Sequence, residues 1–246
     1  MWLSKIRAVL KTFAECLLIL LNLSLPILNN PLLEHRLDID VILRRYCEDY
    51  SSTESRGLNE IERQTHLHTV KRLDASDTIQ GRLISFISHL IRPELIVEIG
   101  TFTGYATGCL SEGLAPNGRI ISIEQNDLFK DMIERNLESL GISDRVDMKY
   151  GDALTILPTI DSEIDLIFID AAKYEYEAYF DLTIDQLRSG GVILADNVLW
   201  KGRVLERNKD KMTTAMHKFN VKIKNDQRVE VVILPYRDGI SLIRKK

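Results

Sequence analysis

Acidic and amide side chains stand at the predicted carboxyl ends of two apolar runs in the second half of the chain. Asp170 closes the run 165–170, and Asp196 and Asn197 close the run 191–196. If the runs are adjacent parallel strands, their ends lie about 4.8 Å apart and these side chains converge. Carboxylate and amide oxygens are hard ligands that favour Mg²⁺, Mn²⁺ or Ca²⁺ over Zn²⁺. The pattern therefore predicts a divalent-metal site, with simple strand and helix capping as the alternative.

Lys173 lies three residues after Asp170, at the predicted start of the next helix. Burial and a nearby cation lower the pKa of a lysine toward neutrality. Such a lysine accepts the proton of a hydroxyl group or orients its oxygen. We therefore expect catalytic roles for Lys173 and Asp170, with a solvated lysine at a helix start as the alternative for Lys173. Trp200 and Lys201 follow Asn197 closely, and we expect them to contact the substrate.

A glycine turn follows the apolar run 95–99 and marks a second candidate site. Gly100 at the end of a strand allows a tight turn and the close approach of a ligand. Ligands of open α/β sheets bind outside the carboxyl ends of the strands. The spacing from Gly100 to Gly104 is GxxxG rather than GxGxxG, and the lysine of a phosphate-binding loop is missing. The turn therefore disfavours a diphosphate ligand.

Acidic residues accompany the ends of the first three runs: Glu98, Glu124 and Asp152. An acid at the position of Glu124 accepts hydrogen bonds from a ribose diol, and Asp152 is placed to accept one from the amine of an adenine ring. Together the three acids surround the predicted pocket with negative charge, which suits a ligand that carries a sulfonium and an ammonium group. Acids that merely end strands are the alternative.

The order of the elements explains how these residues come together. Between residues 95 and 196, short apolar runs alternate with stretches of helical periodicity, a pattern typical of βαβ units and a parallel sheet with helices on both faces. The predicted strands are 95–99, 119–124, 146–150, 165–170 and 191–196, and the predicted helices are 105–114, 127–140, 153–160 and 174–187. After a helix over 210–225, the runs 229–234 and 240–244 are joined by a short turn and must be antiparallel. We predict an α/β fold with a Rossmann-like doubly wound sheet, mostly parallel, with an antiparallel C-terminal hairpin strand.

The beginning of the chain is different. Residues 16–33 are uncharged and mostly apolar and follow basic residues, but asparagines and prolines interrupt the run. Three interpretations stay open: an amphipathic or disordered extension, including an over-extended gene start; a membrane anchor; or a cleaved signal. Helical periodicity follows over 37–92. We expect residues 1–35 to be an apolar extension and 36–246 to be the functional domain.

Composition narrows the class of partner. The net charge is −4 over 246 residues, with both signs interspersed, so we expect no nucleic-acid partner. A membrane partner is expected only if residues 16–33 are an anchor. The cysteines are Cys16, Cys47 and Cys109, and their spacing is typical of neither a disulfide framework nor a metal site. Reduced thiols indicate a cytoplasmic location.

Three segments resemble the cation-dependent O-methyltransferases, the caffeoyl-CoA and catechol O-methyltransferase-like enzymes, and bacterial members look closest. The segments are 98–105 (EIGTFTGY), 168–173 (FIDAAK) and 194–200 (LADNVLW), and the likeness runs from about Asp38 to Lys246. The resemblance implies a seven-stranded sheet with an antiparallel last strand, a homodimer, and S-adenosylmethionine and Mg²⁺ as cofactors. It also implies metal ligands at Asp170, Asp196 and Asn197 and a catalytic lysine at Lys173.

The same resemblance implies which residues bind the cofactor. Combined with the acids considered above, the expected cofactor set is Glu98, Gly100, Thr101, Gly104, Tyr105, Ala106, Glu124, Asp152, Ala153 and Asp170. Two positions depart from the family pattern, because many relatives have Ser in place of Ala106 and Asp in place of Ala172. The segment 74–78 also differs from its more apolar counterpart in relatives, which puts the substrate preference in doubt.

The sequence thus predicts a metal-dependent O-methyltransferase that acts on a small catechol-like or vicinal-diol aromatic hydroxyl, with a phenolic small molecule as its partner. Two alternatives stay open. One is the methylation of a nucleoside hydroxyl in tRNA, against which the charge argues. The other is a non-catalytic protein that binds S-adenosylmethionine, which the alanines at positions 106 and 172 keep open.

Overall fold

The computed structural model describes residues 42–69 and 78–246. The chain divides into two units, residues 1–52 and 53–246. The described part of the first unit contains a helix over residues 42–49. Tyr46 of this helix stacks on Tyr50, the residue that follows it, with ring centroids 4.3 Å apart. The predicted extension 1–35 and residues 74–77 of the divergent segment lie outside the described residues, so the domain division stays a prediction. Within the described ranges, no helix has the length and apolar character that a membrane crossing needs.

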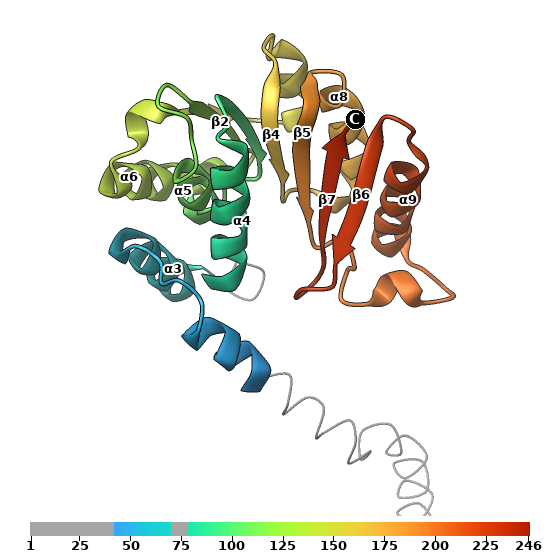
Figure 1. Cartoon of the computed structure of the whole chain (residues 1–246), viewed down its shortest axis with the longest axis horizontal. Helices are drawn as coiled ribbons and strands as arrows, with labels where there is room; N and C mark the ends of the chain where they lie inside the picture. Colours follow the sequence, from blue (N-terminus) through green and yellow to red (C-terminus); the bar gives the residue numbers. More distant parts are fainter. Residues whose placement is uncertain (1–41, 70–77) are drawn as a thin grey trace, which may run out of the picture. The chain divides into compact units, whose positions relative to one another are not determined.

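The second unit is built on a sheet in which the described residues form seven strands, in the order β3-β2-β1-β4-β5-β7-β6 (Figure 1). The strands are β1 (Leu95–Ile99), β2 (Arg119–Glu124), β3 (Val146–Tyr150), β4 (Ile164–Ile169), β5 (Leu187–Asp196), β6 (Val229–Leu234) and β7 (Ile240–Lys245). The pairs among β1 to β5 are parallel, whereas β7 is antiparallel to both of its neighbours, β5 and β6. The predicted sheet is therefore confirmed, including its antiparallel C-terminal strand.

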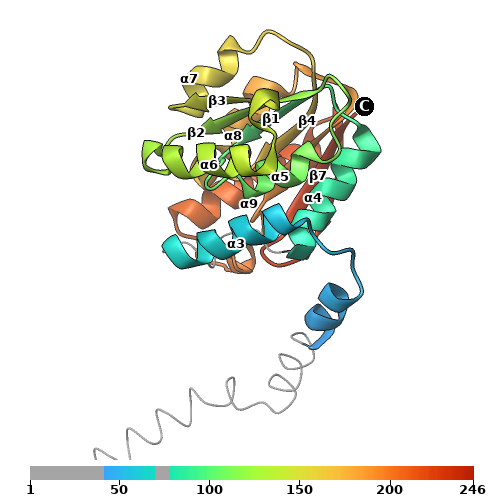
Figure 2. The same cartoon turned by 90° about the vertical axis from the view of Figure 1, so that its left-hand side faces the viewer.

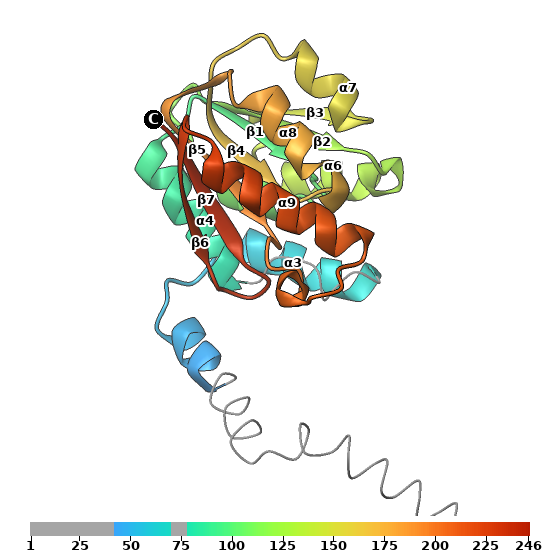
Figure 3. The same ribbon diagram turned by 90° about the vertical axis from the view of Figure 1, so that its right-hand side faces the viewer.

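Helices cover both faces of this sheet. The helices α3 (Arg56–His68), α4 (Thr78–Ile91) and α5 (Tyr105–Ser111) pack in one apolar cluster with side chains from one sheet face (Figure 2). The helices α7 (Ala153–Ile156), α8 (Tyr176–Thr183) and α9 (Lys211–Asn225) pack in a second cluster with the other face (Figure 3). Helix α6 (Lys130–Leu140) contacts α3 and α5. Both faces of β1 and β4 are thus covered, which explains their continuous apolar runs.

Several element boundaries depart from the prediction. The predicted helix 105–114 ends at Ser111, and the predicted helix 153–160 is α-helical only to Ile156, after which the 3₁₀ turn η3 (Leu157–Thr159) follows. The predicted helix 127–140 begins with a 3₁₀ turn, η1 (Asp127–Phe129), before α6. The predicted helix 174–187 is preceded by the 3₁₀ turn η4 (Lys173–Glu175) and ends early, because α8 stops at Thr183 and β5 already begins at Leu187. The pairing of β4 with β5 shifts register between Ile164 and Leu166, and Gly190 in β5 has a φ of +78° that suits a bulge. The glycine pair at 190–191 therefore lies within β5, where it bends the strand. The sequence-based prediction places it between a helix and the start of the strand.

Candidate functional site

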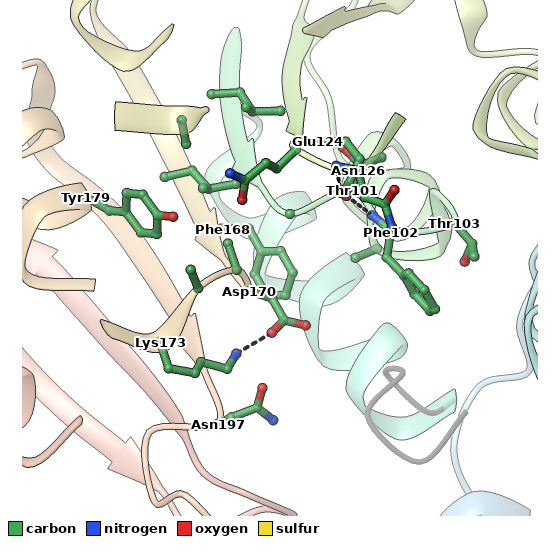
Figure 4. A pocket seen from close by; sticks show the side chains of 18 of the residues that line it. Thr101, Phe102, Thr103, Glu124, Asn126, Phe168, Asp170, Lys173, Tyr179 and Asn197 are labelled. Carbon is green, nitrogen blue, oxygen red and sulfur yellow. Dashed lines mark hydrogen bonds and ion pairs between the residues drawn. The ribbon is translucent and has the colours of Figure 1, made fainter. Parts of the chain in front are cut away.

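A cavity of about 750 Å³ opens beyond the carboxyl ends of β1, β2, β4 and β5 (Figure 4). Its size suits a nucleoside-sized ligand together with a small second molecule. Most of the predicted site residues line it: Gly100, Thr101, Tyr105, Ala106, Glu124, Ala153, Asp170, Lys173, Asn197, Trp200 and Lys201. The others, Glu98, Gly104, Asp152 and Asp196, stand outside the lining formed by the described residues. The glycine turn Gly100–Gly104, from here on the cofactor turn, therefore shares one cavity with two of the three predicted metal ligands, Asp170 and Asn197.

Gly100 allows β1 and β4 to end against each other. Its φ is +97°, and a Cβ atom added at this position would lie 2.1 Å from the Asp170 carbonyl oxygen. The Asp170 amide in turn donates to the Ile99 carbonyl oxygen over 2.9 Å. A side chain here would therefore collide with the backbone of Asp170, and glycine is required for both conformation and space.

Glu124 holds the loops around the cofactor turn. Its Oε2 accepts from the Phe102 amide over 2.7 Å, and its Oε1 accepts from the Asn126 amide over 2.8 Å (Figure 4). Phe102 has a φ of +54°, which a non-glycine residue adopts only when it is held in place. Each carboxylate oxygen has a second lone pair, so the carboxylate that orders the loops can still accept from a ligand.

Helix α3 contributes to the same pocket, which the sequence did not suggest. Glu62 and Thr65 line the cavity, and the Thr65 hydroxyl is hydrogen-bonded to the Thr103 hydroxyl at 2.8 Å. The Asn136 side chain donates to the Thr103 carbonyl oxygen over 2.8 Å. The cofactor turn is therefore fixed from α3 and α6 as well as from the sheet.

Glu98 lies inside the sheet layer. Its Oε2 accepts from the Thr107 and Ser122 hydroxyls, each over 2.5 Å, and its side chain is fully buried. Burial raises the pKa of Glu98 to about 8, more than its hydrogen bonds lower it, and the carboxylates of Glu124 and Asp170 add to the rise. Glu98 therefore carries a proton at neutral pH in this structure. Glu98 therefore does not contribute to the negative charge that we predicted around the pocket. Asp152, another of the three predicted acids, caps α7, because its carboxylate accepts from the Leu154 amide over 3.0 Å.

The raised pKa of Glu98 predicts how stability depends on pH. From the ordinary value of 4.5 up to about 8, the unfolded chain has lost this proton while the folded chain keeps it. The free energy of unfolding therefore falls as the pH rises through this window. We expect Glu98→Gln, which cannot ionise, to gain on the wild type by on the order of a few kcal/mol between about pH 5 and about pH 9. Urea unfolding of both proteins across this range measures the difference, and a difference independent of pH contradicts the assignment.

Lys173, Asp170 and Tyr176 form a compact polar cluster at one end of the cavity. The Lys173 Nζ donates to Asp170 Oδ1 over 2.6 Å (Figure 4). It also donates to the Tyr176 hydroxyl over 2.7 Å. The buried Tyr176 shares its own proton between the carbonyl oxygens of Asp196 at 3.0 Å and Ile169 at 3.3 Å. Tyr176 thus ties the lysine to the ends of both β4 and β5.

The lowered pKa expected for Lys173 depends on a nearby cation, and the side chains of this site alone act in the opposite direction. Burial alone lowers the pKa, but the Asp170 carboxylate and the Tyr176 hydroxyl outweigh burial and raise the pKa above its ordinary range. The cause is local geometry, since η4 places Lys173 back against the carboxylate that precedes it.

Asp196 ends β5 and is almost completely buried. Its Oδ2 accepts from Gln80 Nε2 and its Oδ1 from the Asn197 amide, both over 2.7 Å. Burial and the Asp170 carboxylate raise the pKa of Asp196 to about 6. The described residues contain no group of three or more His, Cys, Asp or Glu side chains able to hold a metal. The predicted ligand set has only two such side chains, Asp170 and Asp196, and its third member is the amide of Asn197. These oxygens fit a hard divalent cation, because two carboxylates near each other without full compensation attract positive charge.

Trp200 and Lys201 line the cavity on a strained segment. Their φ angles are +47° and +55°. The turn between β6 and β7 holds this segment: Asp238 accepts from the Lys201 amide through its carboxylate and from the Leu199 amide through its carbonyl oxygen, the latter over 2.8 Å. Met212 of α9 and Tyr174 of η4 also line this end. Neither residue was identified from the sequence. A single apolar or aromatic side chain near the start of a helix has no sequence spacing that distinguishes a site residue from a core residue.

An open α/β sheet with a glycine turn after β1 and a polar cluster at the next strand ends is typical of Rossmann-like proteins that bind a ligand at the carboxyl ends of the strands. Residues 48–246 match the O-methyltransferase family model. The chain belongs to this O-methyltransferase family and is a methyltransferase.

Relatives and solved structures support this assignment. A catechol O-methyltransferase of Niastella koreensis is 32% identical over 63% of this chain and 72% of its own length. A caffeoyl-CoA O-methyltransferase of Stellaria longipes is 26% identical over 82% of this chain and 90% of its own length. The crystal structure of an SAH-bound methyltransferase of Podospora anserina superposes with a TM-score of 0.79 at 28% identity, covering 85% of this chain and 96% of that one.

Proposed function

We propose that this methyltransferase transfers a methyl group from S-adenosylmethionine to a hydroxyl group of a small catechol-like or vicinal-diol aromatic compound, and that it depends on a divalent cation such as Mg²⁺. The observation that carries the proposal is the position of Asp170. It touches the cofactor turn at Gly100 on one side and the Lys173 amine on the other. A donor and an acceptor bound on the two sides of Asp170 would meet inside one cavity.

The cofactor side of the cavity suits S-adenosylmethionine. Gly100, Thr101 and Ala153 line it, and the Glu124 carboxylate keeps acceptor capacity for a ribose diol. Ala106 and Ala172 both line the cavity as small apolar side chains. We expect these two alanines to weaken cofactor binding relative to relatives with polar residues there, because each removes a hydrogen-bonding group.

The metal would be held by Asp170, Asp196 and Asn197. When bound there, the cation lowers the pKa of the acceptor hydroxyl by Lewis-acid polarisation and offsets the negative charge of the two carboxylates. Asp170 would be the ligand beside the glycine turn at Gly100. Asn197, with a φ of +59°, directly precedes residues 198–201, which we call the acceptor segment.

Lys173 is placed to handle the acceptor proton. Asp170 and Tyr176 fix its amine at the cavity wall, where the amine can orient the acceptor oxygen. With a cation held by Asp170, the carboxylate charge that raises the pKa of Lys173 would be offset, and the amine would then take up or share the acceptor proton. The oxygen attacks the methyl carbon in line with the sulfur, so that a C–O bond forms and a C–S bond breaks. The products are a methyl ether and S-adenosylhomocysteine.

Trp200 and Tyr174 provide aromatic surface at the acceptor end, and Lys201 provides a cation for an acidic substituent. The relatives named catechol O-methyltransferase and caffeoyl-CoA O-methyltransferase support the same class of phenolic acceptor. A homodimer and a cytoplasmic location stay predictions that rest on the sequence and the family likeness.

A methyl-transfer assay tests the proposed function. We expect the purified chain to methylate members of a catechol panel with S-adenosylmethionine and Mg²⁺, and to lose this activity in chelator, because the acceptor hydroxyl ionises poorly without the cation. Monophenols without the second hydroxyl and unmodified tRNA serve as the comparison acceptors. Equal turnover with and without Mg²⁺ rules out the metal mechanism, and methylation of the tRNA alone rules out the small-molecule acceptor.

A further inference from the structure

Gln80 connects the end of β5 to the turn between β6 and β7. It stands in the first turn of α4 and is only 1% exposed. Its Nε2 donates to Asp196 Oδ2 over 2.7 Å, and its Oε1 accepts from a guanidinium nitrogen of Arg237 over 3.1 Å. Three segments far apart in the sequence are therefore joined through one buried amide.

The chemistry of the two neighbours explains why an amide stands here. An ionised carboxylate only accepts hydrogen bonds, and a guanidinium only donates them. A side chain between them must accept on one end and donate on the other, which glutamine does and neither glutamate nor methionine does. The partners also fix which end of the amide faces which neighbour. The direction of the link is thus set from Arg237 through Gln80 to Asp196.

The far end of the link reaches the acceptor side of the cavity. Arg237 has a φ of +49° in the turn between β6 and β7. The two residues after it in this turn hold the acceptor segment, because the carbonyl oxygens of Asp238 and Gly239 accept from the Leu199 and Val198 amides over 2.8 and 3.0 Å. The orientation of the Asp196 carboxylate is therefore connected with the backbone that carries Trp200 and Lys201.

We propose that Gln80 is a positioning residue for the metal site, which orients the Asp196 carboxylate toward the cation and couples it to the turn at Arg237. This inference rests on the proposed function, because it requires Asp196 to be a metal ligand. A carboxylate that must present one lone pair to a cation loses affinity when it is free to rotate. Outer partners of metal ligands are typically worth about 10- to 100-fold in metal affinity. A buried glutamine that only satisfies a carboxylate would instead affect folding stability alone.

Binding of Mn²⁺ to the full chain, followed by electron paramagnetic resonance, tests the proposal. We expect Gln80→Met, which keeps the approximate volume and removes both hydrogen bonds, to weaken Mn²⁺ binding by about 10- to 100-fold. We expect Arg237→Met, which leaves Gln80 in place but frees its far end, to give a smaller loss in the same direction. Ser88→Ala is the matched control: it removes another buried hydrogen bond of α4, from Ser88 Oγ to the Leu110 carbonyl oxygen, and should leave Mn²⁺ affinity unchanged.

Asp196→Asn separates this inference from the proposed function. If Asp196→Asn loses Mn²⁺ while Gln80→Met binds it as the wild type does and only unfolds more easily, the positioning role is wrong and the metal site stands. If Asp196→Asn itself binds Mn²⁺ normally, the metal site is wrong and the inference fails with it. Should Gln80→Met not fold, an Arg237→Met variant with wild-type Mn²⁺ affinity overturns the link.

Discussion

Asp196→Asn is expected to abolish metal-dependent methyl transfer while S-adenosylmethionine still binds. The substitution removes one of the two carboxylate charges of the proposed metal site and almost nothing of its volume. Metal polarisation is worth several kcal/mol of transition-state stabilisation, so we expect kcat to fall by about 10³-fold or more. The cofactor turn at Gly100 and the loop held by Glu124 do not involve Asp196, and cofactor affinity should therefore stay within a few-fold of the wild type.

The same variant should also be less stable, for a reason that can be read from its neighbours. Both oxygens of Asp196 accept from N–H groups, one from Gln80 and one from Asn197. The amide of asparagine must turn its NH₂ group toward one of these donors, which leaves a buried donor unpaired at a cost of about 1–3 kcal/mol. Calorimetric titration of cofactor and Mn²⁺ therefore has to accompany the rate measurement.

Asp165→Asn is the matched control, because Asp165 stands at the opposite end of β4. It accepts from the Glu94 and Leu95 amides and from Arg188, so its loss should lower stability and leave Mn²⁺ binding intact. If the Asp196 variant keeps wild-type turnover in chelator, the cation has no role at this site. If the Asp165 variant loses Mn²⁺ as well, the effect of both substitutions is general destabilisation.

The sheet and the cavity could be predicted from the sequence because both follow from local patterns. Buried parallel strands read as short apolar runs, and a hydrophilic residue at the end of such a run marks the edge of the sheet. Asp170 and Asn197 therefore appear in the structure at the same cavity, although 27 positions separate them in the numbering. Their roles as ligands stay predictions until a metal is bound and measured.

Side-chain direction was harder to predict than position. Successive side chains of a strand point to opposite faces, so Glu98 shares a face with Ile96, under α5, and its carboxylate meets Thr107 and Ser122. The Glu98 side chain therefore lies between the sheet and α5, whereas Gly100, two residues later, lines the cavity. A strand register that is known only to within a residue does not distinguish these cases.

Contacts across long sequence separations could not be predicted at all. Gln80 meets Asp196 across 116 positions, and Thr65 meets Thr103 across 38. These depend on how α3 and α4 lie on the sheet, which periodicity does not specify. Tyr176 is different, since it follows Lys173 by one helical turn and the pair are neighbours on the helix start. Its burial beneath both strand ends needed the structure.

Lys173→Met is expected to lower kcat by about 10²- to 10⁴-fold, the usual range for the loss of a positioned acid–base group. Methionine occupies about the same space as the aliphatic part of the lysine, but it carries no proton and no charge. The ion pair with Asp170, in which the Lys173 amine lies 2.6 Å from the carboxylate, is therefore lost. The KM for S-adenosylmethionine should change little, because Lys173 stands on the acceptor side of Asp170. A rate assay with saturating catechol and Mg²⁺, with KM determined for both substrates, measures this separation.

Two further variants distinguish the proton role of Lys173 from its structural role. Tyr176→Phe keeps the ring, which meets Phe219 edge to face with centroids 5.4 Å apart, and removes the hydroxyl that holds the amine. We expect it to lower kcat in the same direction but less than Lys173→Met, since Asp170 still holds the amine. Lys222→Met removes the ion pair between Lys222 of α9 and Asp181 of α8, neither of which lines the cavity, and should keep wild-type kcat. A Lys173→Met enzyme with wild-type kcat excludes the lysine from the reaction, and a Tyr176→Phe loss larger than that of Lys173→Met shows that the tyrosine acts on more than the amine.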